Sequence, residues 1–514
     1  MLCYVIIIYL MKYFIIYPVH LFENIDIIIS INPDWIYLIE DDKYFNSFPF
    51  HKSKLAYHRA SMSFYHDYLK SQGFNCKYID STIQNKYSWI KSNSLIWSYD
   101  PIDHELRSLF SNLKCKQNIL INSLSFLESI EDLYIYQQTK TNGSKYFHDN
   151  SFYRWQRKRL GLLINDQGKP DGGSWSFDKA NRNKFDQDYI EPKISKWTNE
   201  YWDKAKNYVE STFPDNFGQV LDYSLFPLTF KQNKLHLKKF ISNSLKTFGT
   251  YEDGASPNII AGSHSLLSTS LNVGLITPDY IITQIKKFYS NSSNKTKYIQ
   301  QVEAFIRQVI GWRSYVRFVY EFHGQEMMKE NYLGHNNPIP KSWFRQNPNT
   351  GFDFINQLIS KAWTYGYLHH IERLMYIGNL LLITQTRPLD VYKWFMICFT
   401  DSYEWVMVPN VMGMSQYSVE TIQMMTRPYF SSSAYIKRMS SFDSNDLNFS
   451  NDETYSWDQV WDGLYYNFIS KHQHILKSIY ATAPQVKNLN NLSTSELKKL
   501  KHKANLYLNT YGYK

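Results

Sequence analysis

Cysteine is scarce in this chain of 514 residues, and its four cysteines lie far apart. Cys3, Cys76, Cys115 and Cys398 form no C-x-x-C pair. Local cysteine pairs are typical of structural zinc and iron–sulfur sites, and clustered cysteines are typical of disulfide frameworks. The sequence therefore predicts none of these, and it suits a reducing compartment.

Long apolar runs are also missing. Near the start, the apolar stretches 4–11 and 13–17 are short and separated by Lys12, whereas a membrane-spanning helix needs about 20 consecutive apolar residues. We expect no membrane anchor and interpret residues 13–17 as a buried first strand. Met11 is an alternative start, which would make residues 1–10 an extension.

A glycine-rich phosphate fingerprint is absent after this first strand, where the chain reads PVHLFE at 18–23. A dinucleotide site of the usual kind is therefore not supported. Short apolar runs nevertheless alternate with helical patterns over residues 11–135, which predicts an α/β domain with a parallel, Rossmann-like sheet. The expected strands are 13–17, 35–39, 76–79, 94–99 and 117–121, and the expected helices are 54–72 and 104–113.

Positive charge is in excess, with 56 Lys and Arg against 46 Asp and Glu. A net charge of +10 favours a polyanionic partner such as nucleic acid, although non-specific basicity is an alternative. Residues 136–200 are expected to form a connector between domains. Within it, residues 152–161 combine four cations with three aromatic residues, which suits phosphate contact with base stacking or, alternatively, a basic strap packed between the domains.

Helical patterns dominate residues 201–514, which predicts a large all-helical domain able to enclose a sizeable cofactor. His369 and His370 lie in one of these patterns. Adjacent imidazoles on a helix point about 100° apart, so at most one can face a given pocket. Taken alone, two core histidines would be the default interpretation. The expected helices are 199–211, 231–247, 278–291, 297–323, 352–383, 388–399 and 454–480.

Six motifs in order carry a resemblance. They are FYR at 152–154, GGSWSFD at 172–178 with NR at 181–182, SHSLLS at 263–268, FIRQ at 305–308 with GWR at 311–313, HHIERLM at 369–375, and WV at 405–406 with PNVMGMSQ at 409–416. The set resembles the photolyase and cryptochrome superfamily, in particular the prokaryotic (6-4) photolyase-related branch that normally carries an iron–sulfur cluster. The resemblance extends from about Tyr13 to the C-terminal helices.

This resemblance implies an antenna domain followed by a helical domain that binds FAD. It further implies light-driven repair of pyrimidine (6-4) photoproducts in UV-damaged DNA, by electron transfer from reduced flavin and proton donation from histidine. We expect a monomer in the cytoplasm or another intracellular compartment that contains DNA. The alternatives are a cryptochrome-like blue-light photoreceptor without repair activity and a nucleic-acid-binding remnant without flavin.

Positions in the matching motifs imply individual roles. His370 is the expected proton donor, with His369 beside it as support for lesion or flavin. Trp394 is the expected flavin-proximal member of an electron-transfer chain, and Trp343 is a candidate outer member. The expected FAD contacts are Ser265, Leu267, Ser268, Gln308, Trp312, Arg313, Asp401 and Asn410, and the expected DNA contacts are Arg154, Arg157, Lys158 and Arg182.

The chain departs from the pattern where relatives bind the cluster. The four positions that match cysteines hold Phe354, Asp443, Asp446 and Gln459. No thiolate remains there, so we predict that the chain binds no iron–sulfur cluster and no other metal cofactor.

Two further departures concern flavin and antenna. Ser314 stands where Glu is usual, and Met407 stands where relatives often have an acid, which would change how flavin protonation is controlled. The usual Asp-Gln-Leu start of the antenna loop is replaced at residues 20–22. Glu40 remains a candidate contact for an antenna chromophore of the lumazine or deazaflavin type.

Overall fold

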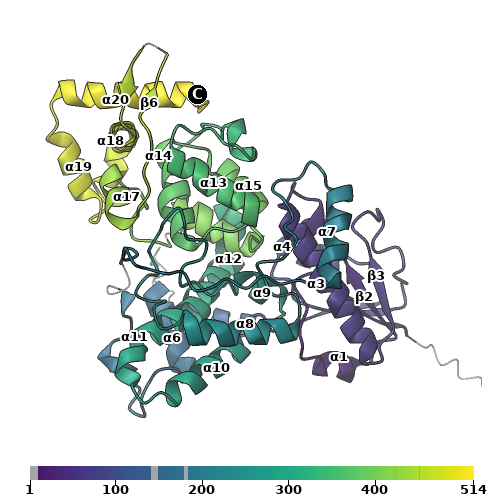
Figure 1. Ribbon diagram of the computed structural model, residues 1–514. Coiled ribbons are helices and arrows are strands. Elements are labelled where there is room, and N and C mark those ends of the chain that lie inside the picture. Colours follow the sequence, from purple (N-terminus) through teal and green to yellow (C-terminus); the bar gives the residue numbers. More distant parts are fainter. Residues whose placement is uncertain are drawn as a thin grey trace, which may run out of the picture.

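The computed structural model describes residues 10–139, 149–178, 183–420, 422, 424–450 and 452–513. Arg182, one of the predicted DNA contacts, lies outside these residues. Figure 1 shows a sheet-containing part beside a larger helical part, with the C-terminal helices stacked at the far end of the helical part.

The first part is built on a five-stranded sheet in which all paired strands are parallel. The strand order is β3-β2-β1-β4-β5, so the order reverses beside β1. Four of the five residues of β1 are buried, as expected for a central strand covered on both faces. The predicted parallel α/β sheet is therefore confirmed, with each strand within one residue of its expected bounds: β1 Lys12–Ile16, β2 Trp35–Ile39, β3 Cys76–Ile79, β4 Leu95–Tyr99 and β5 Gln117–Ile121.

Helices connect these strands, and the long helix α3 packs against α7, which comes later in the chain but lies beside the sheet (Figure 1). At the start of α3, the side chain of His51 accepts a hydrogen bond from the amide of Ser53 and caps the helix. The helices of this part are α1 Asp26–Ile31, α2 Asp42–Phe45, α3 Lys52–Ser71, α4 His104–Ser111 and α5 Ile130–Gln138.

The remainder of the chain is mostly helical, as predicted, with one two-stranded hairpin of β6 Leu447–Asn448 and β7 Thr454–Tyr455 among the described residues. None of the described helices combines the length and the apolar character needed to cross a membrane. The helices are α6 Asp149–Leu160, α7 Glu200–Thr212, α8 Phe230–Asn243, α9 Ser268–Val273, α10 Pro278–Ser290, α11 Lys295–Ile306, α12 Arg313–Met327, α13 Asp353–Tyr365, α14 Asn379–Ile383, α15 Pro388–Cys398, α16 Glu404–Met407, α17 Ser433–Met439, α18 Trp457–Leu476, α19 Ala483–Asn490 and α20 Thr494–Thr510, with 3₁₀ turns η1 Asp171–Gly173 and η4 Lys341–Phe344 and π-helical segments η3 Arg307–Trp312, η5 Glu372–Gly378 and η6 Val408–Ser415.

Two sequence-based expectations differ from the structure. The predicted connector contains helix α6, which packs on η3 and α12 because Phe152, Tyr153 and Gln156 form a buried face. The predicted helix over 352–383 is interrupted at Gly366, which has φ +60° and ends α13 in the left-handed region. Helical structure resumes only at residue 370. The double histidine therefore lies at the start of a helix and not in the middle of one.

Polar contacts join the two parts. Arg107 of α4 forms ion pairs of 2.6 Å with both Asp100 and Glu321. Lys54 of α3 is buried and donates to the carbonyl of Ser402. Burial lowers the pKa of Lys54 to about 7, although the charge of Asp401 acts in the opposite direction. The sheet-containing part thus contributes a buried amine close to the centre of the helical part.

Candidate functional site

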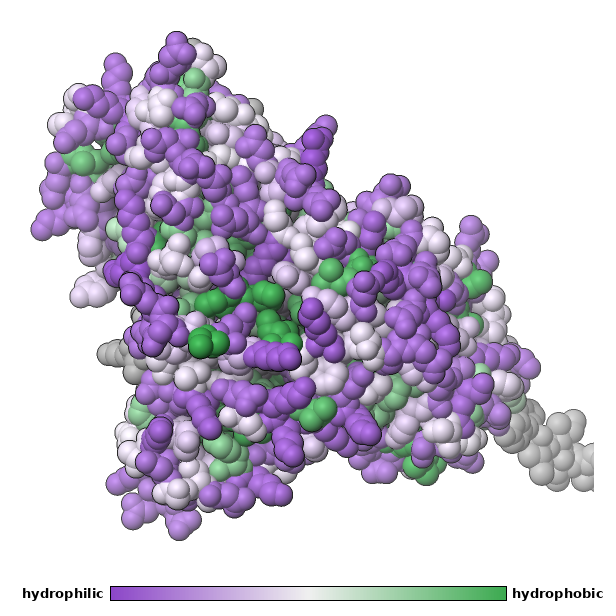
Figure 2. All heavy atoms as spheres, in the orientation of Figure 1, coloured by the Kyte–Doolittle hydropathy of each residue, from purple (hydrophilic) through white to green (hydrophobic). Residues whose placement is uncertain are grey.

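Two cavities adjoin inside the helical part, and His370 lines both. The inner cavity has a volume of about 300 Å³ and the outer one about 1140 Å³. Figure 2 shows a hollow in the middle of the helical part with apolar side chains gathered in it. The structure brings all eight predicted FAD contacts to the wall of the inner cavity: Ser265, Leu267, Ser268, Gln308, Trp312, Arg313, Asp401 and Asn410.

All three π-helical segments border this inner cavity. Gln308 and Trp312 lie in η3, Arg373 lies in η5, and Asn410 lies in η6. The wider turn of a π-helix alters the direction of side chains and is frequent at functional sites. The indole nitrogen of Trp312 donates to Asn410 Oδ1 at 3.2 Å, so η3 and η6 are joined across the cavity wall.

Asp401 connects three elements around the inner cavity. Its carboxylate accepts hydrogen bonds from Ser268 Oγ at 2.8 Å and from Arg373 Nη1 at 2.9 Å. Its backbone carbonyl accepts from Asn272 Nδ2 at 3.1 Å. Sequence reasoning missed Arg373, although its position inside the HHIERLM motif was an available signal. The guanidinium of Arg373 lies 4.0 Å from the ring centre of Phe399.

Arg313 is a cation in the cavity wall that forms no ion pair with the described residues. Its guanidinium lies 4.7 Å from the ring of Phe126 and 4.8 Å from that of Trp405. It donates to Asn272 Oδ1, a neutral acceptor. Burial lowers the pKa of Arg313 to about 9, which the charge of Glu128 only partly offsets. An anionic group bound in this cavity would compensate the desolvated cation.

Three imidazoles gather where the two cavities adjoin. The His264 ring stacks on the His369 ring at 4.8 Å with an angle of 10°, and the His370 ring lies 5.3 Å from that of His264. His264 Nδ1 lies 2.8 Å from the carbonyl oxygen of Ala261, and His369 Nε2 lies 3.4 Å from Glu372 Oε1. Sequence reasoning did not assign a role to His264, although it is part of the SHSLLS motif.

His370 differs from its neighbours because its side chain is 49% exposed to the cavities. Its Nε2 lies 3.4 Å from Asp253 Oδ1. Surrounding protein lowers the pKa of His370, but the hydrogen bond and charge of Asp253, with the charge of Glu252, raise it above the ordinary value overall. Burial instead lowers the pKa of His369 and, well below the usual range, that of His264. The surroundings therefore favour the protonated form of His370 and the neutral forms of His369 and His264.

The outer cavity is lined by cations and aromatic side chains that sequence reasoning did not select. Arg427, Arg438, Tyr429 and Tyr435 lie on its wall with Arg307. Arg307 is held by an ion pair to Glu252 at 3.2 Å. Cations and ring faces together suit phosphate contact and base stacking. These residues are spread over 307–438 and lie outside the basic segment 152–161 in which the sequence predicted DNA contacts.

The predicted DNA contacts on α6 divide into exposed and buried cations. Arg154 and Lys158 are exposed, and both lie within 6 Å of the Trp175 ring, at 5.9 and 5.7 Å. Arg157 is fully buried. Its guanidinium donates to the carbonyls of Leu162, Leu163 and Trp175. This burial contradicts the DNA contact predicted for Arg157, whose charge instead holds the turn after α6.

The two tryptophans of the expected electron-transfer chain lie together. Trp394 of α15 and Trp343 of η4 have ring centres 5.5 Å apart, and the Trp394 indole donates to the Trp343 carbonyl at 3.2 Å. Both side chains are fully buried. Phe395, next to Trp394, lines the inner cavity. The pair therefore begins beside the cavity and leads into the core.

Aromatic rings occupy the region that corresponds to the cluster of the relatives. Phe354 is fully buried, and its ring centre lies 5.4 Å from that of Trp457, 5.6 Å from that of Trp461 and 6.0 Å from that of Phe442. Asp443 accepts a hydrogen bond from the Trp457 indole at 2.9 Å. Asp446 and Gln459 are exposed.

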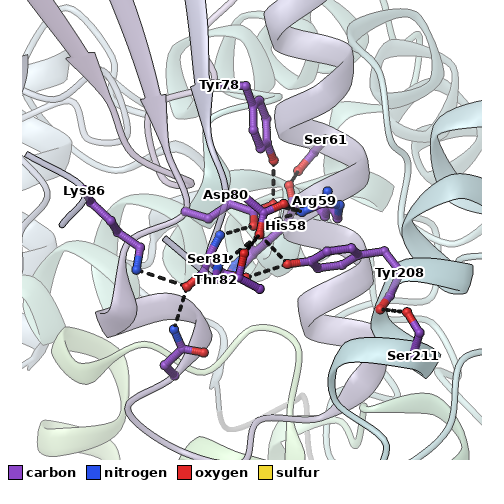
Figure 3. A network of polar contacts seen from close by, with 12 residues as sticks. His58, Arg59, Ser61, Tyr78, Asp80, Ser81, Thr82, Lys86, Tyr208 and Ser211 are labelled. Atoms are coloured by element: carbon purple, nitrogen blue, oxygen red, sulfur yellow. Dashed lines mark hydrogen bonds and ion pairs between the residues drawn. The ribbon is translucent and has the colours of Figure 1, made fainter. Parts of the chain in front are cut away.

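Glu40, the candidate antenna contact, is engaged by the protein itself. Its buried carboxylate accepts hydrogen bonds from Arg59 Nη1 at 2.9 and 3.0 Å and from Tyr78 Oη at 2.6 Å. The Arg59 guanidinium lies 3.3 Å from the ring centre of Tyr208 in α7, and Tyr208 donates to Asp80 (Figure 3). Protein side chains thus fill this place at the carboxyl edge of the sheet, and Glu40 does not fit the role of an antenna contact.

Comparison with known proteins identifies relatives of this chain. Residues 14–224 match the sequence model of the family described as deoxyribodipyrimidine photo-lyase-related protein. A (6-4) photolyase from Agrobacterium fabrum is 30% identical over 481 residues, which cover 89% of this chain and 91% of that protein. An uncharacterized protein of Acanthamoeba polyphaga mimivirus is 31% identical over 193 residues, covering 33% of this chain and 92% of that protein.

Solved structures show the same fold. A bacterial class III photolyase from Agrobacterium tumefaciens matches with a TM-score of 0.54 at 15% identity, covering 96% of this chain and 92% of that one. A cryptochrome from Synechocystis sp. PCC6803 matches with a TM-score of 0.53 at 13% identity, covering 96% and 94%. The identity to the (6-4) photolyase, maintained over most of both chains, shows that this chain belongs to the photolyase and cryptochrome family.

Proposed function

We propose that this chain binds FAD in the inner cavity and repairs pyrimidine (6-4) photoproducts in DNA by a light-driven reaction. The supporting observation is the position of His370, an imidazole whose pKa is raised by Asp253, at the junction of an apolar cavity and a wider basic one. A (6-4) lesion needs a proton moved between its two bases, and a histidine at this junction suits that role.

The residues of the inner cavity fit FAD. Arg313 and Arg373 offer cations, and the Arg313 side chain has a buried Nε without a hydrogen-bond partner among the described residues. Ser265, Leu267 and Ser268 lie at the start of α9, where backbone amides and hydroxyls suit phosphate groups. When bound and reduced, FAD would supply the electron for the reaction on illumination. Trp394 and Trp343 would be the residues that pass an electron toward this cavity.

The chain's own groups would hold and deliver the proton. Asp253 orients His370 through Nε2 and stabilises the imidazolium, which leaves Nδ1 as the second donor. The rings of His369 and His264 lie beside it and restrict its movement. Arg427, Arg438 and the tyrosines of the outer cavity would contact the DNA backbone and the flipped bases.

Illumination of the purified protein with an oligonucleotide that contains a (6-4) photoproduct tests the proposal. We expect restored thymines, together with flavin absorption bands at about 370 and 450 nm. A protein that contains reduced flavin and restores no thymine would refute repair. A protein without flavin bands would refute the cofactor as well.

A second candidate function is that of a flavin-binding photoreceptor without repair activity. Met407 favours it, because this buried apolar side chain lines the inner cavity at a position where it can exchange no proton with a bound flavin. The same assay separates the two functions, since a photoreceptor would show light-dependent flavin chemistry and leave the lesion intact.

A further inference from the structure

Three imidazoles converge in the wall of the inner cavity. One ring nitrogen from each of His264, His369 and His370 lies within 4.8 Å of the other two. They come from two distant segments, the loop before α9 and the start of the helix after Gly366. Proton donation requires only His370, so the convergence of all three needs another account.

Each ring has an oxygen beside one of its two nitrogens. Ala261 O lies 2.8 Å from His264 Nδ1, Glu372 Oε1 lies 3.4 Å from His369 Nε2, and Asp253 Oδ1 lies 3.4 Å from His370 Nε2. A carbonyl that accepts N–H from one ring nitrogen, as Ala261 O can from His264 Nδ1, fixes the tautomer and directs the lone pair of the other nitrogen outward. This arrangement is usual behind histidines that ligate metal ions. The Glu372 carboxylate lies near His369 Nε2 without forming a hydrogen bond to it.

Three ring nitrogens of this cluster have no hydrogen-bond partner among the described residues. They are His264 Nε2, His369 Nδ1 and His369 Nε2, and all three atoms are buried. Leaving a buried acceptor unpaired costs free energy, which a bound ligand would recover.

We propose that His264, His369 and His370 form a binding site for a divalent transition-metal ion of the zinc type. Three imidazole nitrogens and an open fourth position suit such an ion, whereas Mg²⁺ and Ca²⁺ prefer oxygen ligands. Side-chain rotations would bring the nitrogens to coordination distance, and the half-exposed His370 has room to move. The metal would take the lone pair that otherwise carries the His370 proton, so a bound ion and proton donation exclude each other.

Co²⁺ is a suitable probe because tetrahedral nitrogen coordination gives it intense visible absorption. The full-length protein, freed of metal with a chelator and kept in the dark without DNA, is titrated with Co²⁺ and then with Zn²⁺. We expect one equivalent of Co²⁺ to bind in tetrahedral geometry, to be displaced by Zn²⁺ and to be unaffected by excess Mg²⁺. His264→Ala should abolish the signal, and Asp253→Asn should weaken binding by about tenfold or more.

Two controls make the outcome decisive. His474→Ala removes an exposed histidine elsewhere on the surface and should change nothing. His264→Gln keeps most of the side-chain volume, so it should retain the secondary structure measured by circular dichroism while it loses the Co²⁺ signal. Octahedral coordination, a signal that survives in His264→Gln, or a signal lost instead in His335→Ala, which disrupts the separate His335–His472 pair, would overturn the proposal. Because the experiment needs neither light nor a lesion, its result is independent of repair.

Discussion

The proposed role of His370 depends on two opposing effects on its pKa, the burial of its ring and the charge of nearby carboxylates. Protein around the ring disfavours the imidazolium, and Asp253 with Glu252 more than compensates. We predict that His370→Ala lowers (6-4) repair by about 10²–10⁴-fold, the usual contribution of general acid catalysis. Photoreduction of the flavin should stay nearly unchanged, as followed by its absorbance. Equal loss of repair and photoreduction would mean that His370 supports the flavin site instead.

The effect of Asp253 on the His370 pKa can be tested through the pH dependence of repair. The donor must be protonated, so repair should fall as pH rises through the His370 pKa. Asp253→Asn removes the hydrogen bond and charge that raise this pKa. We therefore predict that the alkaline limb of the pH–repair profile moves to lower pH in Asp253→Asn. An unshifted limb would show that another group donates the proton.

The cations of α6 separate a DNA contact from a structural role. Arg154→Ala and Lys158→Ala should each reduce the slope of log affinity against log salt concentration by about 1, as expected for the loss of one phosphate contact. Arg157→Ala should instead lower the free energy of unfolding by roughly 2–4 kcal/mol, because it leaves buried carbonyls unpaired. Binding titrations at several salt concentrations and denaturant unfolding measure the two effects. A smaller slope of log affinity against log salt concentration in Arg157→Ala, with unchanged stability, would instead support the DNA contact predicted for Arg157 from the sequence.

At the scale of elements, the sequence predicted secondary structure correctly where all side chains of an element are buried. The strands of the sheet are short apolar runs, and a parallel sheet covered on both faces produces such runs. Helix α6 was missed because its buried face includes Gln156 and Arg157, which read as solvent-exposed residues. The break at Gly366 was missed because the apolar spacing continues across it, although its left-handed backbone ends the helix.

In the candidate site, sequence motifs predicted some residues, and other residues could be identified only from tertiary contacts. Motif position alone placed eight residues that the structure finds around one cavity. His264, Arg373 and Asp253 were not selected, because their importance depends on neighbours far away in sequence. The π-helical segments were not predicted either. Their backbone hydrogen bonds join residues i and i+5, which are only one residue farther apart than the bonded residues of an α-helix.

The aromatic cluster around Phe354 gives a prediction about an element interface. Its ring lies against Trp457 and Trp461 of α18 and against Phe442, in the region of the relatives' cluster. Phe354→Ala should lower the free energy of unfolding by about 3–5 kcal/mol, the usual cost of removing a buried phenyl ring. Denaturant unfolding measures this change, with the exposed Phe344→Ala as the control. A cost below about 1 kcal/mol would mean that the region repacks or is loosely packed.

At the scale of the whole molecule, protein side chains occupy the sheet edge where an antenna chromophore would be expected. Ligands of open parallel sheets bind beyond the carboxyl ends of the strands. In this protein, Glu40 follows β2 at that edge, and its carboxylate is fully engaged by Arg59, Tyr78 and the amide of Ser81. Tyr208 of α7, the helix that packs on α3 beside the sheet, covers the Arg59 guanidinium. Contacts between protein side chains thus take the place of a ligand contact.

This closure predicts how the protein uses light. Without a second chromophore at this edge, the action spectrum of flavin photoreduction should follow the flavin absorption alone. Incubation with a lumazine or a deazaflavin should add neither a retained absorption band nor energy transfer, because a ligand would have to displace the Arg59–Glu40 ion pair. Arg59→Ala leaves the Glu40 carboxylate without its cation and should weaken the contact with α7, which lowers the thermal midpoint. An additional band in the wild-type action spectrum that disappears on mutation of Glu40 would contradict this interpretation and would require the side chains at the sheet edge to open for the ligand.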